Sequence, residues 1–166
     1  EASRQAVCNP SALPTMPARP TMLIADMTTR IIDVRSADLL PEYEEMTPFE
    51  NIQWMSVLKS LSGYQMYRRN MQERVNRPFV LRFLLKEKKF PRSFFHSLLE
   101  VKYCLKHLPR NEEAIDLLND VGKKVLRADQ AILQQDELHR FIDELQLGLA
   151  ELHTVIYSTC FRLPVR

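Results

Sequence analysis

The side chains best suited to bind a ligand lie between Tyr64 and Ser93, where tyrosines and arginines gather near predicted helix ends. An arginine can hold a carboxylate or a phosphate through two parallel hydrogen bonds, and the first turn of a helix offers unpaired amides to an anion. The candidate binding residues are Tyr64, Tyr67, Arg68, Arg69, Arg92 and Ser93. They would suit an acyl phosphate or a peptide carboxylate. The alternative, which we favour for Arg68 and Arg92, is that these arginines fasten helix ends to carbonyls or to acids of neighbouring helices.

No other set of residues in the sequence matches a known catalytic or metal site. His96 and Glu100 are four residues apart and would share a helix face, but no second pair supports a metal site. The sequence also lacks the Glu-x-x-His spacing of di-iron bundles, a glycine-rich phosphate loop and a Gly-x-Ser-x-Gly motif. We therefore predict no catalytic residue, no bound metal and no cofactor, and the sequence leans against an enzyme.

Charge is distributed unevenly along the chain, although the net charge is only +2. Residues 68–92 carry nine Lys or Arg against two Glu, a net charge of +7, whereas residues 38–50 carry five acids and no base. A basic segment of this kind can bind nucleic acid or another acidic partner. Nucleic-acid binding is the weaker alternative, because charged segments of a folded protein more often face each other or water.

Composition and hydrophobic spacing predict an all-α protein. The 166 residues include only three glycines, which disfavours a turn-rich β fold, and apolar residues recur at helical spacing from Thr21 to Phe161. We expect about six helices in an antiparallel bundle, because amphipathic helices joined by short loops bury their apolar faces most simply in this way. Residues 1–20 contain four prolines and no regular spacing, so we expect a disordered arm there and a helical domain over residues 21–166.

Each predicted helix has an expected core-facing stripe. For a first helix from Thr21 to about Leu40 the stripe is Leu23, Met27, Ile31 and Val34. For a second helix from Thr47 to Arg69 it is Ile52, Met55, Leu58 and Leu61, with Trp54 beside it. Further helices are expected over residues 78–86 with Asn76 as the cap, 91–108, 111–132 with Asn111 as the cap, and 136–160. Their expected core residues are Val80, Leu81, Phe83, Leu84, Leu85, Phe94, Phe95, Leu98, Val101, Leu105, Leu108, Ile115, Leu118, Val121, Val125, Ile132, Leu138, Phe141, Ile142, Leu145, Leu149, Leu152, Ile156 and Cys160.

Cysteine usage and hydropathy indicate where the protein works. Cys8, Cys104 and Cys160 are widely spaced and suggest neither a disulfide framework nor a metal pair, so we expect a cytoplasmic protein. No apolar run approaches the roughly 18 residues of a membrane helix, so no membrane span is expected. The first residues, from Glu1 onward, lack the basic start and apolar core of a secretory signal.

Several segments of the sequence resemble the bacterial Alpha-E family of all-helical proteins. The segments that carry the resemblance are Ala25–Asp33, Thr47–Arg69, Phe83–Leu85, Phe90–Ser93, Phe141–Gln146 and Tyr157–Phe161. Together they span Ala25 to Phe161 and correspond to the C-terminal half of the family's longer domain. Two adjacent positions depart from the family. Its adjacent Glu-Arg pair precedes the Ala-Asp dipeptide, where this chain has Leu23 and Ile24.

The resemblance implies a context and no reaction. Family members occur beside ATP-grasp ligase-like and transglutaminase-like proteins, which implies a part in making or modifying small peptides. We expect a non-catalytic protein-interaction module, with an enzyme component that binds an anionic substrate as the rival interpretation. Half of a larger domain would leave an apolar face uncovered, so we expect a homodimer or a complex with another protein. The first and last helices are the expected interface.

Overall fold

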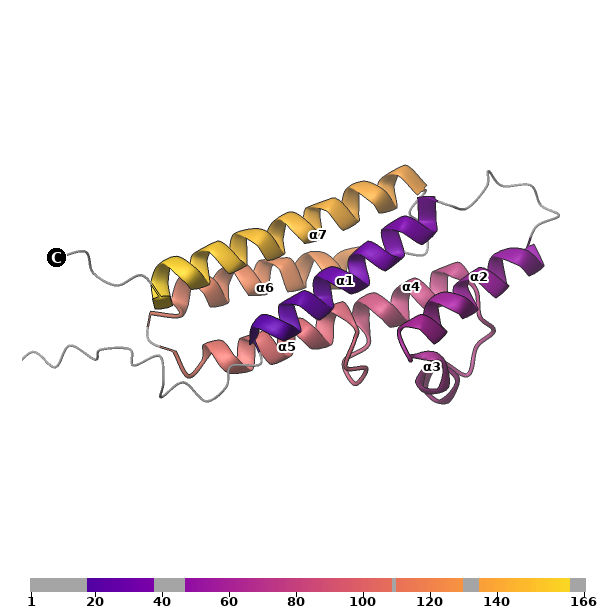
Figure 1. Ribbon diagram of the computed structural model, residues 1–166, viewed down its shortest axis with the longest axis horizontal. Helices are drawn as coiled ribbons and strands as arrows, with labels where there is room; N and C mark the ends of the chain where they lie inside the picture. Colours follow the sequence, from indigo (N-terminus) through magenta and orange to yellow (C-terminus); the bar gives the residue numbers. More distant parts are fainter. Residues whose placement is uncertain (1–17, 38–46, 109, 130–134, 162–166) are drawn as a thin grey trace, which may run out of the picture.

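The computed structural model describes residues 18–37, 47–108, 110–129 and 135–161. Within these ranges the chain forms seven α-helices and one π-helical turn, and no strand (Figure 1). The helices are α1 (Ala18–Ala37), α2 (Thr47–Ser60), α3 (Tyr64–Met71), α4 (Arg77–Lys86), α5 (Phe94–Leu105), α6 (Glu112–Arg127) and α7 (Gln135–Ile156), followed by η2 (Tyr157–Phe161). The predicted all-α class is confirmed, and the number of helices is close to the six expected.

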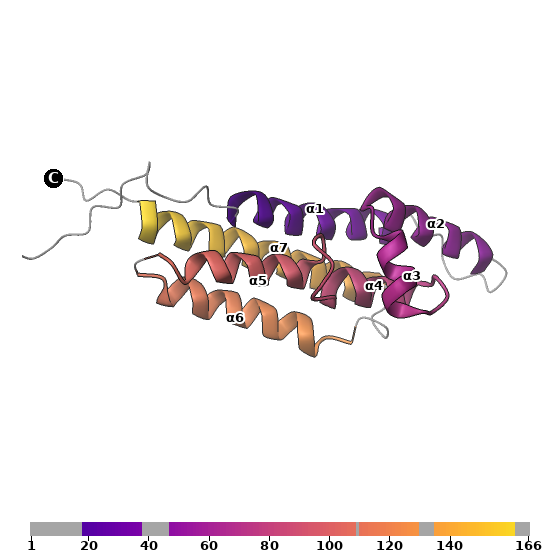
Figure 2. The ribbon, with the colours of Figure 1, turned by 90° about the horizontal axis from the view of Figure 1, so that it is seen from below.

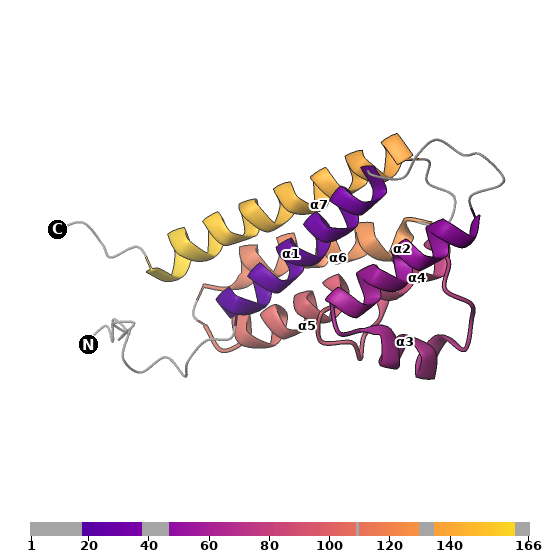
Figure 3. The ribbon, with the colours of Figure 1, turned by 45° about the vertical axis from the view of Figure 1, so that its right-hand side comes forward.

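Four long helices form an elongated bundle. α1 packs against α5 and α7, and α6 packs against the same two helices from the other side (Figures 1 and 2). α2, α3 and α4 lie toward one end, where α4 contacts α2, α3 and α5. α1 and α7 run side by side in opposite directions along the bundle (Figure 3).

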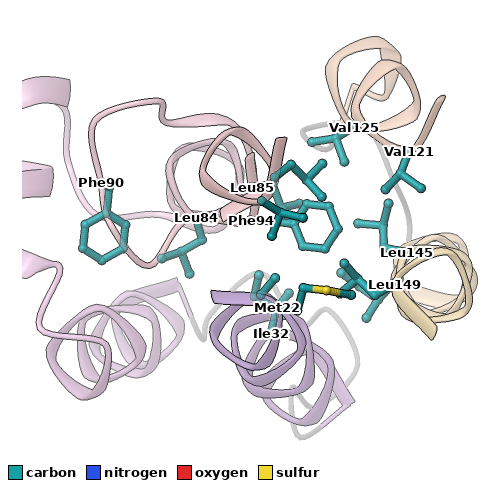
Figure 4. Packing of buried hydrophobic residues seen from close by; sticks show 14 of the residues in the cluster. Met22, Ile32, Leu84, Leu85, Phe90, Phe94, Val121, Val125, Leu145 and Leu149 are labelled. Carbon is teal, nitrogen blue, oxygen red and sulfur yellow. The ribbon is translucent and has the colours of Figure 1, made fainter. Parts of the chain in front are cut away.

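The core is continuous from α1 to α7. Buried side chains from α1, α4, α5, α6 and α7 meet along the bundle axis, among them Met22, Leu85, Phe94, Val125 and Leu149 (Figure 4). The expected core residues of α4 and α5 are confirmed, as is most of the predicted seam of α7, but Phe141 in α7 and Ile115 in α6 are only partly buried. In these helices the apolar stripe is broad enough to leave one choice of buried face.

The predicted core stripe of the first helix is wrong for three of its four residues. Leu23, Met27 and Val34 are each 58% exposed, and Ile31 is only partly buried. Leu23 and Met27 are four residues apart, and Met27 and Val34 are seven apart. The three side chains therefore form one apolar stripe along the outer side of α1.

The opposite face of α1 is buried although it carries hydroxyl groups. Thr28, Thr29 and Ser36 are all almost fully buried. Thr29 Oγ1 donates to the carbonyl of Asp26 at 2.8 Å, and Ser36 Oγ donates to the carbonyl of Ile32 at 2.5 Å. Because bonds of this kind along the helix satisfy a hydroxyl, a Ser or Thr can enter the core at little cost.

The predicted second helix is two helices separated by a sharp turn. α2 ends at Ser60, Ser62 has a φ of 55°, and the Gly63 amide donates to the carbonyl of Leu58 at 2.7 Å. A Cβ on Gly63 would lie 2.9 Å from Phe90 Cζ, so the turn needs a residue without a side chain. The buried stripe of α2 is also shifted, since Trp54, Val57, Leu58 and Leu61 are buried and Ile52 is exposed.

Several predicted helix ends are corrected. α1 begins at Ala18, three residues inside the predicted arm, while the rest of that arm lies outside the described residues. α5 starts after Ser93, later than the predicted start at Pro91. Asn76 caps α4 as predicted, but the side chain of Asn111 donates to the Leu105 carbonyl instead of capping α6. Helix α6 ends at Arg127, and Cys8, Ile132 and the side chain of Cys160 are outside the described residues.

Candidate functional site

Two of the candidate binding residues predicted from sequence are buried and stabilise the fold. Tyr67 is fully buried, and its hydroxyl donates to the carbonyl of Arg74 at 3.0 Å. Burial raises the pKa of Tyr67 to about 12, with a smaller contribution from the charge of Glu73. Ser93 is also fully buried; its Oγ accepts the amide proton of His96 at 3.1 Å as the cap of α5. Both hydroxyls therefore have structural partners.

The segments that carry the family resemblance meet around these two residues. The Tyr67 ring contacts Phe83 edge-on at 5.4 Å between centroids, and Phe83 stacks on Phe90 at 4.9 Å. Thr28 Oγ1 in α1 donates to the carbonyl of Arg92 at 2.9 Å. These contacts tie α1, α3 and α4 to the loop before α5. The motifs most similar to the family thus build a junction between helices.

The remaining candidate residues are more exposed. Tyr64 is partly buried, and Arg68 and Arg69 are exposed on α3. Arg92 is exposed in the loop before α5, where its Nη1 donates to Ser62 Oγ at 3.4 Å. The expected clamp of Arg92 on buried carbonyls or carboxylates is therefore replaced by a long contact with an exposed hydroxyl at the α2–α3 turn.

The other titratable candidates do not assemble into a reactive group. His96 Nε2 lies 3.9 Å from Glu100 Oε1, and its Nδ1 lies 2.7 Å from the carbonyl of Lys88. Cys104 is partly buried. Among the described residues, no three His, Cys, Asp or Glu side chains come together as metal ligands would. In the same part of the chain, no helix is long and apolar enough to cross a membrane.

A groove with a volume of about 680 Å³ lies between α1 and α7, and five of its ten lining residues are apolar. Its floor contains the largely buried Met22 and Leu149, and its walls contain Leu23 and Leu147. Leu147 is 69% exposed, more than any other large apolar side chain among the described residues. The sequence indicated these two helices as the interface. Their outer stripe was missed because Leu23 and Met27 were assigned to the core.

Charged groups beside the groove are paired within the chain. Arg30 Nε lies 2.8 Å from Asp26 Oδ2, and this hydrogen bond raises the pKa of Arg30. His139 Nδ1 lies 2.5 Å from Asp33 Oδ1, and its Nε2 lies 3.6 Å from Asp143 Oδ2. The hydrogen bond and charge of Asp33, followed by the charge of Asp143, raise the pKa of His139. The groove therefore combines apolar side chains with two ion pairs, and its remaining polar lining is Gln146 and His153, an arrangement that suits binding better than acid–base chemistry.

Comparison with known proteins places the chain in a family without defining a reaction. No curated protein and no solved structure matches the chain significantly. The adjacent Glu-Arg pair in this sequence is Glu73-Arg74, just after α3, whereas the pair expected from the resemblance is replaced by Leu23 and Ile24 in α1. A family model described as "a predicted alpha-helical domain with a conserved ER motif" matches residues 24–161, most of the chain, and the protein therefore belongs to the Alpha-E family.

Proposed function

We propose that this protein is a non-catalytic helical module that binds another polypeptide through the exposed face of α1 and α7. The observation that carries the proposal is that the exposed Leu23 and Leu147 line a groove of about 680 Å³, while Met27 and Val34 extend the exposed apolar stripe of α1. Covering one such side chain completely stabilises an assembly by about 1.5–3 kcal/mol. Exposed apolar surface gathered along two adjacent helices is typical of interaction sites.

The proposal extends to the system in which the module works. We propose that it acts in bacterial peptide synthesis or modification, beside ATP-grasp-like or transglutaminase-like proteins, because the family resemblance implies that context. The internal contacts of two candidate residues weigh against the rival enzyme component with an anionic substrate. Tyr67 already has a partner inside the fold, and so does Ser93, which leaves Arg68, Arg69 and Arg92 as the exposed residues of that candidate site.

Affinity capture with the tagged chain, followed by identification of the bound proteins, tests the proposed function. We expect the tagged chain to capture either an untagged copy of itself or a ligase-like or transglutaminase-like protein, and this capture should be lost with Leu147→Arg, because a guanidinium cannot enter an apolar contact without losing its hydration. The matched control is Leu126→Arg on α6, where the natural side chain is also exposed, at 48%. This control should capture the same proteins as the natural chain.

Three outcomes would contradict the proposal. The first is capture that is identical for the natural chain and for Leu147→Arg. The second is substrate turnover by the isolated chain, which would favour the enzyme interpretation. The third is a mobility shift with nucleic acid at low salt that weakens steeply as salt is added, which would favour the basic segment over residues 68–92 as the binding surface.

A further inference from the structure

We infer that the polypeptide covering the α1–α7 groove is a second copy of this chain, related to the first by a two-fold axis. The inference rests on the proposed function, because it names the occupant of the same face. In this dimer, α1 and α7 of both copies form a four-helix bundle in which every helix has antiparallel neighbours.

The register between α1 and α7 makes the face self-complementary. Asp33 and His139 are hydrogen-bonded and therefore level with each other along the two antiparallel helices. Leu147 comes eight residues after His139, so it is level with the α1 residue eight before Asp33, between Leu23 and Met27. A two-fold axis parallel to the helices lays α7 of the second copy over α1 at the same height. Leu147 of each copy then packs between Leu23 and Met27 of the other.

When the whole face is covered, its size reaches the lower limit for a specific dimer interface. α1 contains 20 residues and is about 30 Å long, since an α-helix rises about 1.5 Å per residue. Two helices about 9 Å apart, each about 10 Å across, make a face about 19 Å wide. The face is then roughly 570 Å² per copy, or about 1,100 Å² for both copies, which exceeds the roughly 1,000 Å² expected of a specific interface.

The charge distribution also suits a second copy. Arg30 is paired with Asp26, and His139 lies between Asp33 and Asp143, all within one chain. A partner that covers the groove therefore needs an apolar face with equally matched charges, because an unpaired buried charge is costly. The second copy presents such a face.

Sedimentation equilibrium of the full chain at about 1–100 μM tests the inference, and we expect a dimer at the low-micromolar end of this range. Leu147→Arg and Met27→Asp each place a charge in the interface and should weaken self-association by roughly 30-fold or more. Both side chains are exposed in one copy, at 69% and 58%, so circular dichroism should show unchanged helix content. The control Leu126→Arg should remain dimeric.

Mixing the two monomeric variants tests the register itself. A heterodimer of Met27→Asp with Leu147→Arg places the new carboxylate against the new guanidinium in one half of the interface. In the other half, the unchanged Leu147 and Met27 meet. We expect the mixture to recover dimers that neither variant forms alone. A monomeric natural chain at about 100 μM, a dimer unaffected by Leu147→Arg, or a mixture that stays monomeric would each overturn the inference.

The same measurements separate this inference from the proposed function. If the natural chain is monomeric and still captures a different protein that Leu147→Arg loses, the two-fold dimer is wrong and the proposed function stands. If the natural chain is monomeric and Leu147→Arg changes no captured protein, both are wrong.

Discussion

Replacing Ser93 with alanine removes a small side chain that joins two parts of the structure. Its Oγ accepts the amide proton of His96 in the first turn of α5 and donates to the carbonyl of Glu87 at the end of α4. The serine is fully buried, so water cannot replace either partner without rearrangement. Ser93→Ala should therefore lower stability although it deletes a single oxygen atom.

The expected loss is about 2–3 kcal/mol. A lost serine cap costs about 1 kcal/mol, and a buried carbonyl left without its donor costs about 1–3 kcal/mol. The two contributions share the same oxygen, so their simple total is an upper bound. For a chain of this length, 1 kcal/mol corresponds to about 2–4 °C, so the melting temperature should fall by about 4–12 °C.

Thermal and urea unfolding, followed by circular dichroism at the helix band, would measure this change. The control variant is Arg92→Ala, at the neighbouring position. Arg92 is exposed and its side chain makes a long hydrogen bond of 3.4 Å to Ser62, so its removal should change stability by no more than about 0.5 kcal/mol. Equal melting temperatures for Ser93→Ala and the natural chain would refute the structural role given to Ser93. A large loss with Arg92→Ala would restore the clamp predicted from the sequence.

Three further perturbations test other parts of the structure. Tyr67→Phe should lower the free energy of unfolding by about 1 kcal/mol, measured by calorimetry. Because the pKa of Tyr67 is about 12 in the folded chain and about 10 in the unfolded chain, the natural chain should also lose stability as the pH rises above about 10. If the natural chain and Tyr67→Phe lose the same stability above this pH, the burial argument is wrong. Since Asp33 raises the pKa of His139, that histidine should stabilise the α1–α7 contact below its unfolded pKa of about 6.5 and lose this effect as the pH rises through the folded value. His139→Ala should therefore lower the urea midpoint more at pH about 5.5 than at pH about 8, and an equal effect at both would contradict this. Gly148→Ala would place a Cβ 2.8 Å from Val121 Cγ2, so it should lower stability by about 1–3 kcal/mol despite the better helix propensity of alanine. Adding Val121→Ala should recover stability. If Gly148→Ala alone is more stable than the natural chain, the Val121 side chain moves aside without cost.

The sequence predicted the core best where one helix face is apolar over several turns. In α7, Leu138, Leu145 and Leu152 are spaced seven residues apart, and all three are buried. In α4, Phe83, Leu84 and Leu85 are consecutive, so any orientation of the helix buries most of them. For such patterns, the buried face of a helix can be predicted without knowing which other helix will cover it.

The candidate site was predicted less well, because residue types do not reveal which contacts are already made. Tyr67 and Ser93 have the chemistry of ligand-binding residues, but the loop before α5 and the end of α3 provide their partners. The turn at Gly63 was missed as well, since glycine after a helix can also continue it and Phe90 lies far away in the sequence. The partners of Tyr67 and Ser93 lie only seven and six residues away, so they depend on how the chain turns after α3 and α4, whereas the turn at Gly63 depends on a distant segment.

Local hydrogen bonding and periodicity are encoded in the sequence itself, which is why the helical class, most helices and the cap at Asn76 follow from it directly. Periodicity shows that α1 has an apolar face, but it does not show whether that face meets the rest of the same chain. Tertiary packing decided this question: Thr28 bonds to the Arg92 carbonyl and turns the hydroxyl face inward, while Leu23 and Met27 remain outside. The physical reason is that a hydroxyl with an acceptor can be buried as readily as a methyl group, so the winning face is the one whose shape and acceptors match the neighbouring helices.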